Sequence, residues 1–587
     1  MQRFLVTTAL EQTWDVKRPI VFLGEWCRLF GRRDLWSPLD GVVHPYHWDD
    51  RAKYREDYVD LSALYEKKLA QLSQSLGRMH GLPTTPEYWR IIIGPWLRFF
   101  ADALFDRFES VRSVIDSGGV DGSRVMQYRL TDWVPADFLH FYSNFVGDAW
   151  NHIVYAESMR SLGMPFSELD EVLSPPAPAS IRRSYRQVAK RMFERYCQAV
   201  PQRFNRVALV SAALPAGRLS RLQYAMGQFP YPRSPVLRVE STAFDVKKRQ
   251  SVIANDASGG FEALLDKLLR QWMPRSYIEN FPALRRLALE KYPEAPSVIF
   301  TANAYQADDG FKIWAAHHIH ENRVPLVIGQ HGGNMGISLF NQTEDHQIRI
   351  ADLFATWGWS TEGQSNVRPM PAMKLGVLGA RPDVGGDILL TTASYPRYFY
   401  CHYAIPVAGQ YLEYLQDQIR FVQCLAPEMR QFVKIRPDAD NFGWDVLARL
   451  REAGLGEAID AKKESLGKRL KRCRLSVATY NSTIFLETLA ENFPTLVFFD
   501  PGLFEIRPEA VAAVDMLRRV GIFHDSPESA AEFLNRIGQD VFSWWNDEGL
   551  QAARVAFCNQ YARTSPDWIG AWSQLFRSLR NDGKCRS

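Results

Sequence analysis

Short apolar runs alternate with helical segments from about Arg206 onward, and this alternation limits the possible folds more than any other feature of the sequence. Each run has the length of a strand and is apolar throughout, rather than at every second residue. Strands that are hydrophobic on both faces occur in parallel sheets that helices cover on both sides. In the first series we expect strands at 207–210, 236–239, 297–300 and 324–328.

A second series begins near Asp387, with strands expected at 388–390, 432–435, 475–478 and 495–499. The stretch between Ser360 and Gly386 is rich in glycine, proline and alanine, which indicates a linker. The chain has 587 residues, too many for one hydrophobic core. The predicted fold class is therefore α/β, with two Rossmann-like doubly wound parallel-sheet domains facing a cleft.

The first 200 residues follow a different pattern. One short strand is expected at roughly 19–24, and the remainder is mostly helical, with helices at 87–105 and about 135–162. A proline-rich break follows at Pro175-Pro176-Ala177-Pro178. The predicted domains are residues 1–370, with a helical insertion at about 30–200, then residues 371–575, and a tail at 576–587.

Charge and composition limit which cellular compartment and which binding partners we expect. The formal net charge is only +4, which gives no general case for nucleic acid as a partner. Basic residues cluster between Lys462 and Arg474, where we expect a solvated helix face, with an acidic membrane surface or glycan as the alternative partner. The seven cysteines are scattered and no window approaches about 18 uncharged apolar residues, so we expect a cytoplasmic protein.

Ligands of open parallel sheets bind beyond the carboxyl ends of the strands. The strand at 475–478 leads into Thr479, Tyr480, Asn481, Ser482 and Thr483, at the expected start of a helix. Free backbone N–H groups and the helix dipole favour a phosphate there. Glu487 shares a helix face with Thr483 and is placed to accept ribose hydroxyls. The alternative is an ordinary helix cap with Glu487 in solvent.

Two further strand ends supply cations. Lys434 and Arg436 suit a diphosphate or an acidic sugar, with a surface salt bridge as the alternative. Ser394 and Arg397 follow the first strand of the second series, where Arg397 is in reach of a leaving-group phosphate, with a packed connecting loop as the alternative. The triplet Asp438-Ala439-Asp440 matches a metal-binding pattern that is common by chance, and we expect no metal.

The last strand of the first series ends in Gln330-His331-Gly332-Gly333-Asn334. Glycine permits close backbone approach, and a histidine can exchange protons near neutral pH. His331 is therefore the first catalytic candidate, and Asp308 and Glu25 are candidate bases that have the alternative role of acids at helix starts. A Gly-x-Gly-x-x-Gly turn between a strand and a helix is absent from the sequence, and so is a Walker A loop.

Several segments resemble a family of transferases encoded in bacterial O-antigen and surface-polysaccharide gene clusters. The likeness spans almost the whole chain. The segments are Phe4-Leu5-Val6-Thr7-Thr8-Ala9, Leu23-Gly24-Glu25-Trp26-Cys27, Tyr88-Trp89-Arg90 with Gly94-Pro95-Trp96-Leu97, Gln330-His331-Gly332-Gly333, Pro396-Arg397-Tyr398, and Tyr480-Asn481-Ser482-Thr483 with Glu487-Thr488-Leu489-Ala490.

More distantly, the second half is similar to GT-B capsule enzymes that use CMP-linked ulosonic acids. In those enzymes a His-Pro pair ends one strand, and a serine-rich loop with a downstream glutamate follows another. Here Arg436-Pro437 stands at the place of the His-Pro pair, and Asn481-Ser482-Thr483 with Glu487 fits the second element. The resemblance implies a GT-B-like fold, a CMP-linked donor and no other cofactor.

The leading functional hypothesis is a glycosyltransferase that moves a sugar from a nucleotide donor to a surface-polysaccharide or lipopolysaccharide acceptor. Residues 371–575 would bind the donor and residues 1–370 the acceptor, with peripheral contact to the inner membrane. One alternative is a CDP-polyol phosphotransferase of the teichoic-acid type. Another is a non-catalytic glycan- or nucleotide-binding protein.

Overall fold

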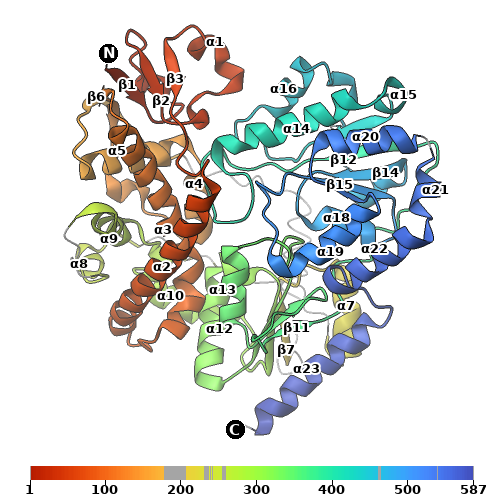
Figure 1. Cartoon of the computed structure of the whole chain (residues 1–587). Coiled ribbons are helices and arrows are strands. Elements are labelled where there is room, and N and C mark those ends of the chain that lie inside the picture. Colours follow the sequence, from red (N-terminus) through yellow and green to blue (C-terminus); the bar gives the residue numbers. More distant parts are fainter. Residues whose placement is uncertain are drawn as a thin grey trace, which may run out of the picture.

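The computed structural model describes residues 2–176, 206–229, 237, 239–240, 242–253, 259–460, 464–538 and 540–585. These residues contain three parallel sheets of four or five strands, named here the first, middle and last sheets in chain order, and one two-stranded pair (Figure 1). The middle and last sheets confirm the predicted α/β class with two parallel sheets. The first sheet was not predicted.

The first sheet has the order β3-β2-β1-β4 and only parallel pairings. Its strands are β1 (Arg3–Val6), β2 (Ile20–Phe22), β3 (Gly41–Val43) and β4 (Val120–Gly122). Only β2 was expected. β3 and β4 lack a continuous apolar run and are partly exposed, whereas β1 is as apolar as β2 and was missed. A parallel pair also joins β5 (Arg124–Gln127) and β6 (Ser167–Val172).

Long helices lie between the first and middle sheets and form what we name the helical layer. Its members are α2 (Arg51–His80), α3 (Pro86–Asp116), α4 (Phe138–Asn144), α5 (Asp148–Ser161), α8 (Val246–Gln250) and α9 (Gly260–Trp272). The single helix expected at 135–162 is instead α4 and α5. The chain turns between them because the Asn151 side chain donates hydrogen bonds to the carbonyls of Phe145 and Gly147, at 2.9 and 2.8 Å.

The middle sheet has the order β11-β10-β9-β8-β7. Its strands are β7 (Val207–Val210), β8 (Val298–Thr301), β9 (Leu326–Gly329), β10 (Leu353–Thr356) and β11 (Val367–Pro369), and its helices are α7 (Ala216–Ala225), α10 (Phe281–Lys291), α11 (Ala304–Ala307), α12 (Asp309–Asn322) and α13 (Gln342–Ile350). The strand expected at 236–239 lies largely outside the described residues. Because β11 is an edge strand, it tolerates Pro369, and part of the expected linker therefore belongs to the sheet.

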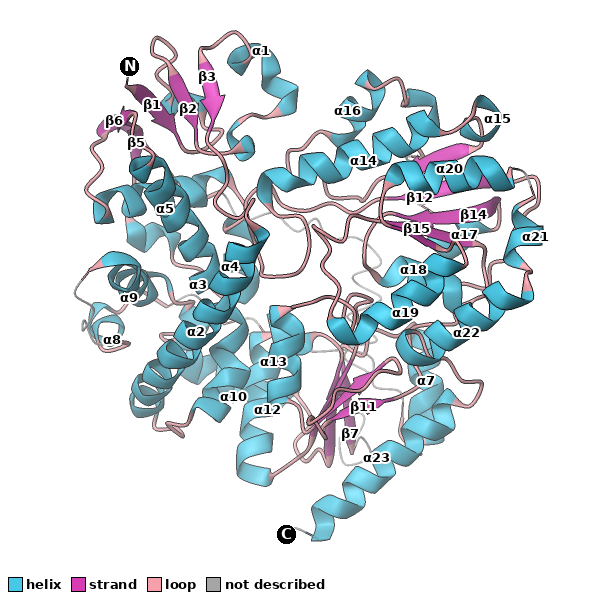
Figure 2. Ribbon diagram, viewed as in Figure 1, coloured by secondary structure: helices cyan, strands magenta, loops and turns pink. Residues whose placement is uncertain are grey.

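The last sheet has the order β13-β12-β14-β15-β16. Its strands are β12 (Asp387–Thr391), β13 (Val433–Arg436), β14 (Cys473–Ala478), β15 (Thr495–Phe498) and β16 (Phe523–His524). Helices α14 (Tyr411–Cys424) and α20 (Pro527–Ile537) lie on one face, and α18 (Thr483–Ala490), α19 (Pro508–Arg519) and α22 (Glu548–Tyr561) lie on the other (Figure 2). Shorter helices complete this half: α15 (Pro427–Arg430), α16 (Val446–Glu452), α17 (Leu466–Leu470) and α21 (Val541–Trp545).

The final helix, α23 (Trp568–Cys585), crosses back to the middle sheet. The rings of Trp572 and Phe576 pack on Phe300 of β8, with centroid distances of 5.4 and 5.7 Å. The tail expected at 576–587 therefore begins inside a packed helix.

The basic cluster near residue 470 is not simply a solvated helix face. Arg469 is buried and pairs with Asp387 at 2.6 Å, and Arg474 is buried in β14 with its guanidinium 4.1 Å from the Phe432 ring centroid. Lys462 and Lys463 lie outside the described residues. Among the described helices, none combines the length and the apolarity needed to cross a bilayer.

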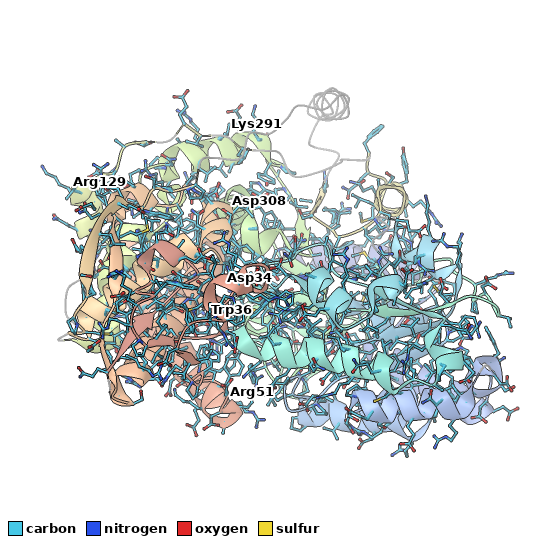
Figure 3. The ribbon with its side chains drawn as sticks, turned by 90° about the horizontal axis from the view of Figure 1, so that it is seen from above. Asp34, Trp36, Arg51, Arg129, Lys291 and Asp308 are labelled. Carbon is cyan, nitrogen blue, oxygen red and sulfur yellow. The ribbon has the colours of Figure 1, made fainter. Side chains whose placement is uncertain are left out.

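The loop after β12 leaves the last sheet and inserts among the amino-terminal helices. Tyr54 donates a hydrogen bond to the carbonyl of Tyr403 at 3.0 Å, and Arg107 donates one to the carbonyl of Phe399 at 2.8 Å. Near this loop, Arg51 forms a bidentate ion pair with Glu505 at 2.8 and 2.9 Å. Figure 3 shows Arg51 at the boundary between the amino-terminal helices and the carboxyl-terminal half. We name these contacts the interdomain junction.

Replacing Arg51 by alanine is expected to lower the free energy of unfolding by about 3 kcal/mol, because Glu505 would keep a buried charge without its nearest partner. The matched control is Arg420→Ala, whose guanidinium forms exposed pairs with Asp417 and Glu528 and should cost less than about 1 kcal/mol. Thermal unfolding followed by circular dichroism measures both. Equal losses would contradict a structural role for the junction.

Candidate active site

The loops that follow β9 and β14 meet where the carboxyl edges of the middle and last sheets face each other. The backbone N–H of Gly333 donates to Thr483 Oγ1 at 3.1 Å, and Asn481 Nδ2 donates to Ser338 Oγ at 3.1 Å. A Cβ atom added at Gly333 would lie 2.6 Å from the Thr483 nitrogen. The expected close approach of this glycine is therefore real, and its neighbour is the start of α18.

His331 lies in the first of these loops with its ring centroid 6.3 Å from that of Tyr305. Its Nδ1 atom is buried and has no hydrogen-bond partner among the described residues. Burial, and then the positive charge of Lys374, lowers the pKa of His331 to about 4. The imidazole is therefore neutral at pH 7 and can accept a proton.

Glu487 faces the same region from α18. Burial raises the pKa of its carboxyl group, and the positive charge of Lys374 acts in the opposite direction. Lys374 thus lies close enough to act electrostatically on both His331 and Glu487. Its loop is held by Arg218, which donates to the carbonyls of Met373, Leu375 and Gly376 at 2.8, 3.1 and 2.9 Å.

The start of α18 is open to a ligand in part. Ser482 occupies the N-cap position, but no side chain caps the helix. Thr483 already accepts the Gly333 N–H. Thr479 is committed to the fold, because its hydroxyl donates to the Thr391 carbonyl at 2.9 Å and contacts the Tyr414 hydroxyl at 2.7 Å. Tyr480 lies beside Ser482, and burial raises the pKa of its phenol.

A cavity of about 300 Å³ lies at the carboxyl ends of β12 and β13. Thr392 and Ser394 line it, and Thr392 Oγ1 is buried without a partner among the described residues. Ser394 lies beside Tyr411 and lowers the pKa of that phenol, which burial raises. Arg436, at the end of β13, donates to the Glu464 carbonyl at 2.6 Å, and its Nη1 atom is buried and unpaired within the described part of the chain. These polar groups suit a polar ligand.

Arg397 and Lys434, which were expected to bind phosphate, have other partners in the structure. Arg397 pairs with Asp148 at 2.7 Å and donates to the carbonyls of Phe442, at 2.9 Å, and Trp26. It therefore ties the last sheet to the amino-terminal segment. Lys434 donates to the Glu457 carbonyl at 3.1 Å, so its ammonium group already has a backbone partner.

The other loop residues have structural contacts. Gln330 accepts hydrogen bonds from Trp357 N and Trp359 Nε1 and donates to the carbonyls of Gly332 and Met335. The carbonyl of Asn334 accepts from the backbone of Ile337 and Ser338. Gly332 takes part through its backbone carbonyl, which accepts a hydrogen bond from Gln330, and it has no side chain for catalysis.

Neither acid proposed as a base is free. Asp308 caps α12 by accepting the Phe311 N–H at 2.9 Å, and its second oxygen accepts the Tyr292 hydroxyl at 2.7 Å. Glu25 pairs with Arg28 and packs against Gly409 instead of His331. Both have the alternative role that sequence analysis left open. Asp438 and Asp440 are exposed, and no group of three or more metal-ligating side chains occurs in the described ranges.

Lys374 is a candidate site residue that the sequence did not indicate. It lies in the segment interpreted as a linker, five residues after β11 ends at Pro369. The apolar Val367 near the start of that segment was the sequence signal for a strand there. Had it been interpreted as a strand, its carboxyl end would have directed attention to the loop that follows.

Replacing Gly333 by alanine is expected to cost about 1–3 kcal/mol of stability, because the added methyl group collides with the backbone of Ser482 and Thr483. Gly217→Ala is the control, since a Cβ there meets nothing within 4 Å at the start of α7. Thermal unfolding compares the two. If Gly333→Ala melts like the control, the two loops are not in contact.

The pKa of His331 predicts a pH effect. Since its folded pKa is about 4 and the ordinary value is 6.5, the unfolded chain binds a proton in this window that the folded chain does not. The stability contributed by the neutral ring is therefore lost as the pH falls from about 6.5 to 4. Urea unfolding at about pH 7.5 and pH 5 should show a smaller loss in His331→Gln than in the wild type. An equal loss would exclude burial of the ring.

Among curated proteins, none matches the chain. Among solved structures, the chain is similar to MurG of Acinetobacter baumannii, at 10% identity, over 63% of this chain and 99% of that chain, with a TM-score of 0.32. It is also similar to the spinosyn rhamnosyltransferase SpnG complexed with spinosyn aglycone, at 13% identity, over 64% and 99%, with a TM-score of 0.29. A family model described as LIC12162 family transferase matches residues 3–576. The chain therefore belongs to the LIC12162 family of transferases.

Proposed function

We propose that this transferase is a glycosyltransferase that moves a sugar from a nucleotide-activated donor to a glycan acceptor. The observation that carries the proposal is the contact between Gly333 and Thr483, at the facing carboxyl edges of two parallel sheets. Such edges are where open parallel sheets bind their ligands, and two of them brought together provide for two substrates. Family membership supports transfer chemistry.

The donor belongs on the last sheet in this proposal. Its phosphate groups would lie at the start of α18, near Ser482 and Lys374, where a helix dipole and a cation favour negative charge. Glu487 would accept hydroxyl groups of the ribose. The nucleoside would extend toward the cavity lined by Thr392 and Ser394, whose polar atoms support such a ligand.

The acceptor belongs on the middle-sheet side, near His331. Burial makes the neutral ring a weak base, so it would take the proton of an acceptor hydroxyl late, once that oxygen has begun to bond to the sugar and has become strongly acidic. The leaving nucleotide takes the electron pair of the broken bond, and Lys374 and Arg436 would offset its charge. We therefore propose a reaction that proceeds without a metal ion.

The finer assignments are part of the same proposal. A CMP-linked ulosonic acid is the first donor to test, on the resemblance of the 480–487 segment to capsule enzymes. A surface-polysaccharide or lipopolysaccharide acceptor would place the enzyme at the cytoplasmic face of the inner membrane. The mass of the product separates this reaction from transfer of a phosphopolyol, because the latter adds a phosphate to the acceptor.

Thermal-shift titrations with CMP, CDP, UDP, GDP and ADP test donor binding. The wild type should be stabilised by at least one of them, and Lys374→Ala should weaken that binding about tenfold or more, because a charged contact to phosphate is removed. Lys434→Ala is the control, since this lysine donates to the Glu457 carbonyl. If no nucleotide stabilises the wild type, or if both variants bind equally well, the proposed donor site is wrong.

A further inference from the structure

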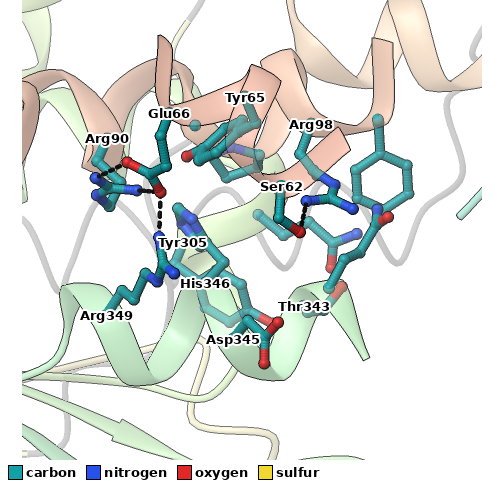
Figure 4. A pocket seen from close by; sticks show the side chains of 15 residues that line it. Ser62, Tyr65, Glu66, Arg90, Arg98, Tyr305, Thr343, Asp345, His346 and Arg349 are labelled. Atoms are coloured by element: carbon teal, nitrogen blue, oxygen red, sulfur yellow. Dashed lines mark hydrogen bonds and ion pairs between the residues drawn. The ribbon is translucent and has the colours of Figure 1, made fainter. Parts of the chain in front are cut away.

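A cavity of about 50 Å³ lies between α2 and α3 of the helical layer and α11 and α13 of the middle domain (Figure 4). It has no part in the reaction proposed above. Its volume accommodates a few water molecules or one compact polar group. The walls combine the aromatic rings of Tyr65, Phe99 and Tyr305 with arginine and histidine side chains.

Four of the side chains that line this cavity have a buried polar atom without a partner in the described structure: Tyr65, Tyr305, Gln342 and His346. The hydroxyl of Tyr305 and Nε2 of His346 make no hydrogen bond with any described residue, and their rings lie 5.9 Å apart. Figure 4 shows both side chains at the centre of the cavity. A buried polar group without a partner is costly. The Tyr305 hydroxyl can donate a hydrogen bond, and so can Nε2 of the neutral His346 ring when that nitrogen carries the proton, so the two groups together indicate a missing acceptor ligand.

The charges around the cavity specify the ligand. Burial, and then the positive charges of Arg90, Lys312 and Arg349, lowers the pKa of His346 to about 3. The charged side chains that line the cavity are three arginines, Arg90, Arg98 and Arg349, and two acids, Glu66 and Asp345, which gives a net charge of +1 (three minus two). Asp345 accepts a hydrogen bond from the Tyr58 hydroxyl. Glu66 is held between two of these arginines, with both its oxygens 2.7 Å from Arg90 and a further contact to Arg349. A carboxylate is thus already part of the wall.

The cavity is shaped by a glycine on α3. A Cβ atom added at Gly94 would lie 2.7 Å from the Tyr65 hydroxyl and 2.9 Å from Cε1 of His346. Arg90 precedes Gly94 by one helical turn, so the same stretch of α3 supplies both the space and a cation. The fold therefore keeps this volume open.

We propose that the cavity is a subsite for a compact oxyanion, a carboxylate or phosphate group, carried by the acceptor. Tyr305 and His346 would bind the anion directly, and Arg90 and Arg349 would supply the positive field. Tyr305 also neighbours His331, at a centroid distance of 6.3 Å, so one acceptor can reach both places. The role assigned to the acceptor rests on the proposed function, whereas binding of the anion does not.

Entry is from the surface beside Arg349. Its side chain is 54% exposed and that of Glu66 is 37% exposed, whereas Tyr305 and His346 are enclosed. Exposed ion pairs are weak and exchange readily, so an incoming anion can compete with Glu66 for Arg349. The charged end of a ligand would therefore meet the arginines first.

The test is binding of inorganic phosphate, glucuronate and glucose to the full chain, measured by thermal shift and calorimetry. Phosphate or glucuronate should bind and glucose should not, and which anion binds more tightly identifies the source of the oxyanion. Tyr305→Phe should weaken anion binding about tenfold. Without ligand, the same variant should melt no lower than the wild type, because it removes an unpaired buried hydroxyl.

Tyr155→Phe is the matched control, since its hydroxyl is also buried and unpaired in the described structure but lies away from the cavity. It should leave anion binding unchanged. Arg349→Ala, a change at an exposed residue, should weaken anion binding without loss of folding. Anion binding that is absent in the wild type, or equal in Tyr305→Phe and Tyr155→Phe, would overturn the proposal. Nucleotide titrations of the same variants report separately on the donor site.

Discussion

The interdomain junction is the constraint on which the rest of the structure depends. Buried ion pairs and hydrogen bonds join the loop after β12 and the neighbouring Glu505 to the amino-terminal helices, through Arg51, Arg107 and Tyr54. Charges buried at such a boundary are costly unless they are paired, so the two halves are held in a narrow range of relative positions. That placement brings the carboxyl edges of the middle and last sheets together. It thereby brings together His331, which follows β9 of the middle sheet, and Thr483, which follows β14 of the last sheet.

Because the two edges are in contact, most polar side chains at the candidate site hold the loops in place, and few are available to a ligand. Thr479, Gln330 and Asp308 are used to hold loops and helix starts in place. What remains available is a neutral imidazole, a carboxylate and a lysine, with an uncapped helix start between them. Polar groups that the scaffold leaves unpaired beside a cavity or a strand end are therefore candidates for ligand contacts.

Buried polar atoms without partners lie in different surroundings in the two halves of the molecule. In the last sheet, the unpaired atoms of Thr392 and Arg436 lie at strand ends, as expected of a nucleotide site. Between the helical layer and the middle sheet, those of Tyr305 and His346 lie in a small cavity whose lining has a net positive charge. The two places suit different ligands, a nucleotide and a compact anion, and Tyr305 lies close to His331 as well. A transferase needs two such places.

The sequence by itself determined the parallel sheets and the loops that carry ligands, because both follow from local hydrophobicity and from glycine and helix-start patterns. The strands at 207–210 and 475–478 and the close approach of Gly333 were predictable in this way. Only the tertiary structure decided which charged residues remain free. Arg397 turns toward Asp148 and Lys434 toward Glu457, while Lys374 comes from a supposed linker to act on both His331 and Glu487. The physical reason is that the partner of a charged side chain is fixed by distant segments, and a pattern of neighbouring residues contains no information about them.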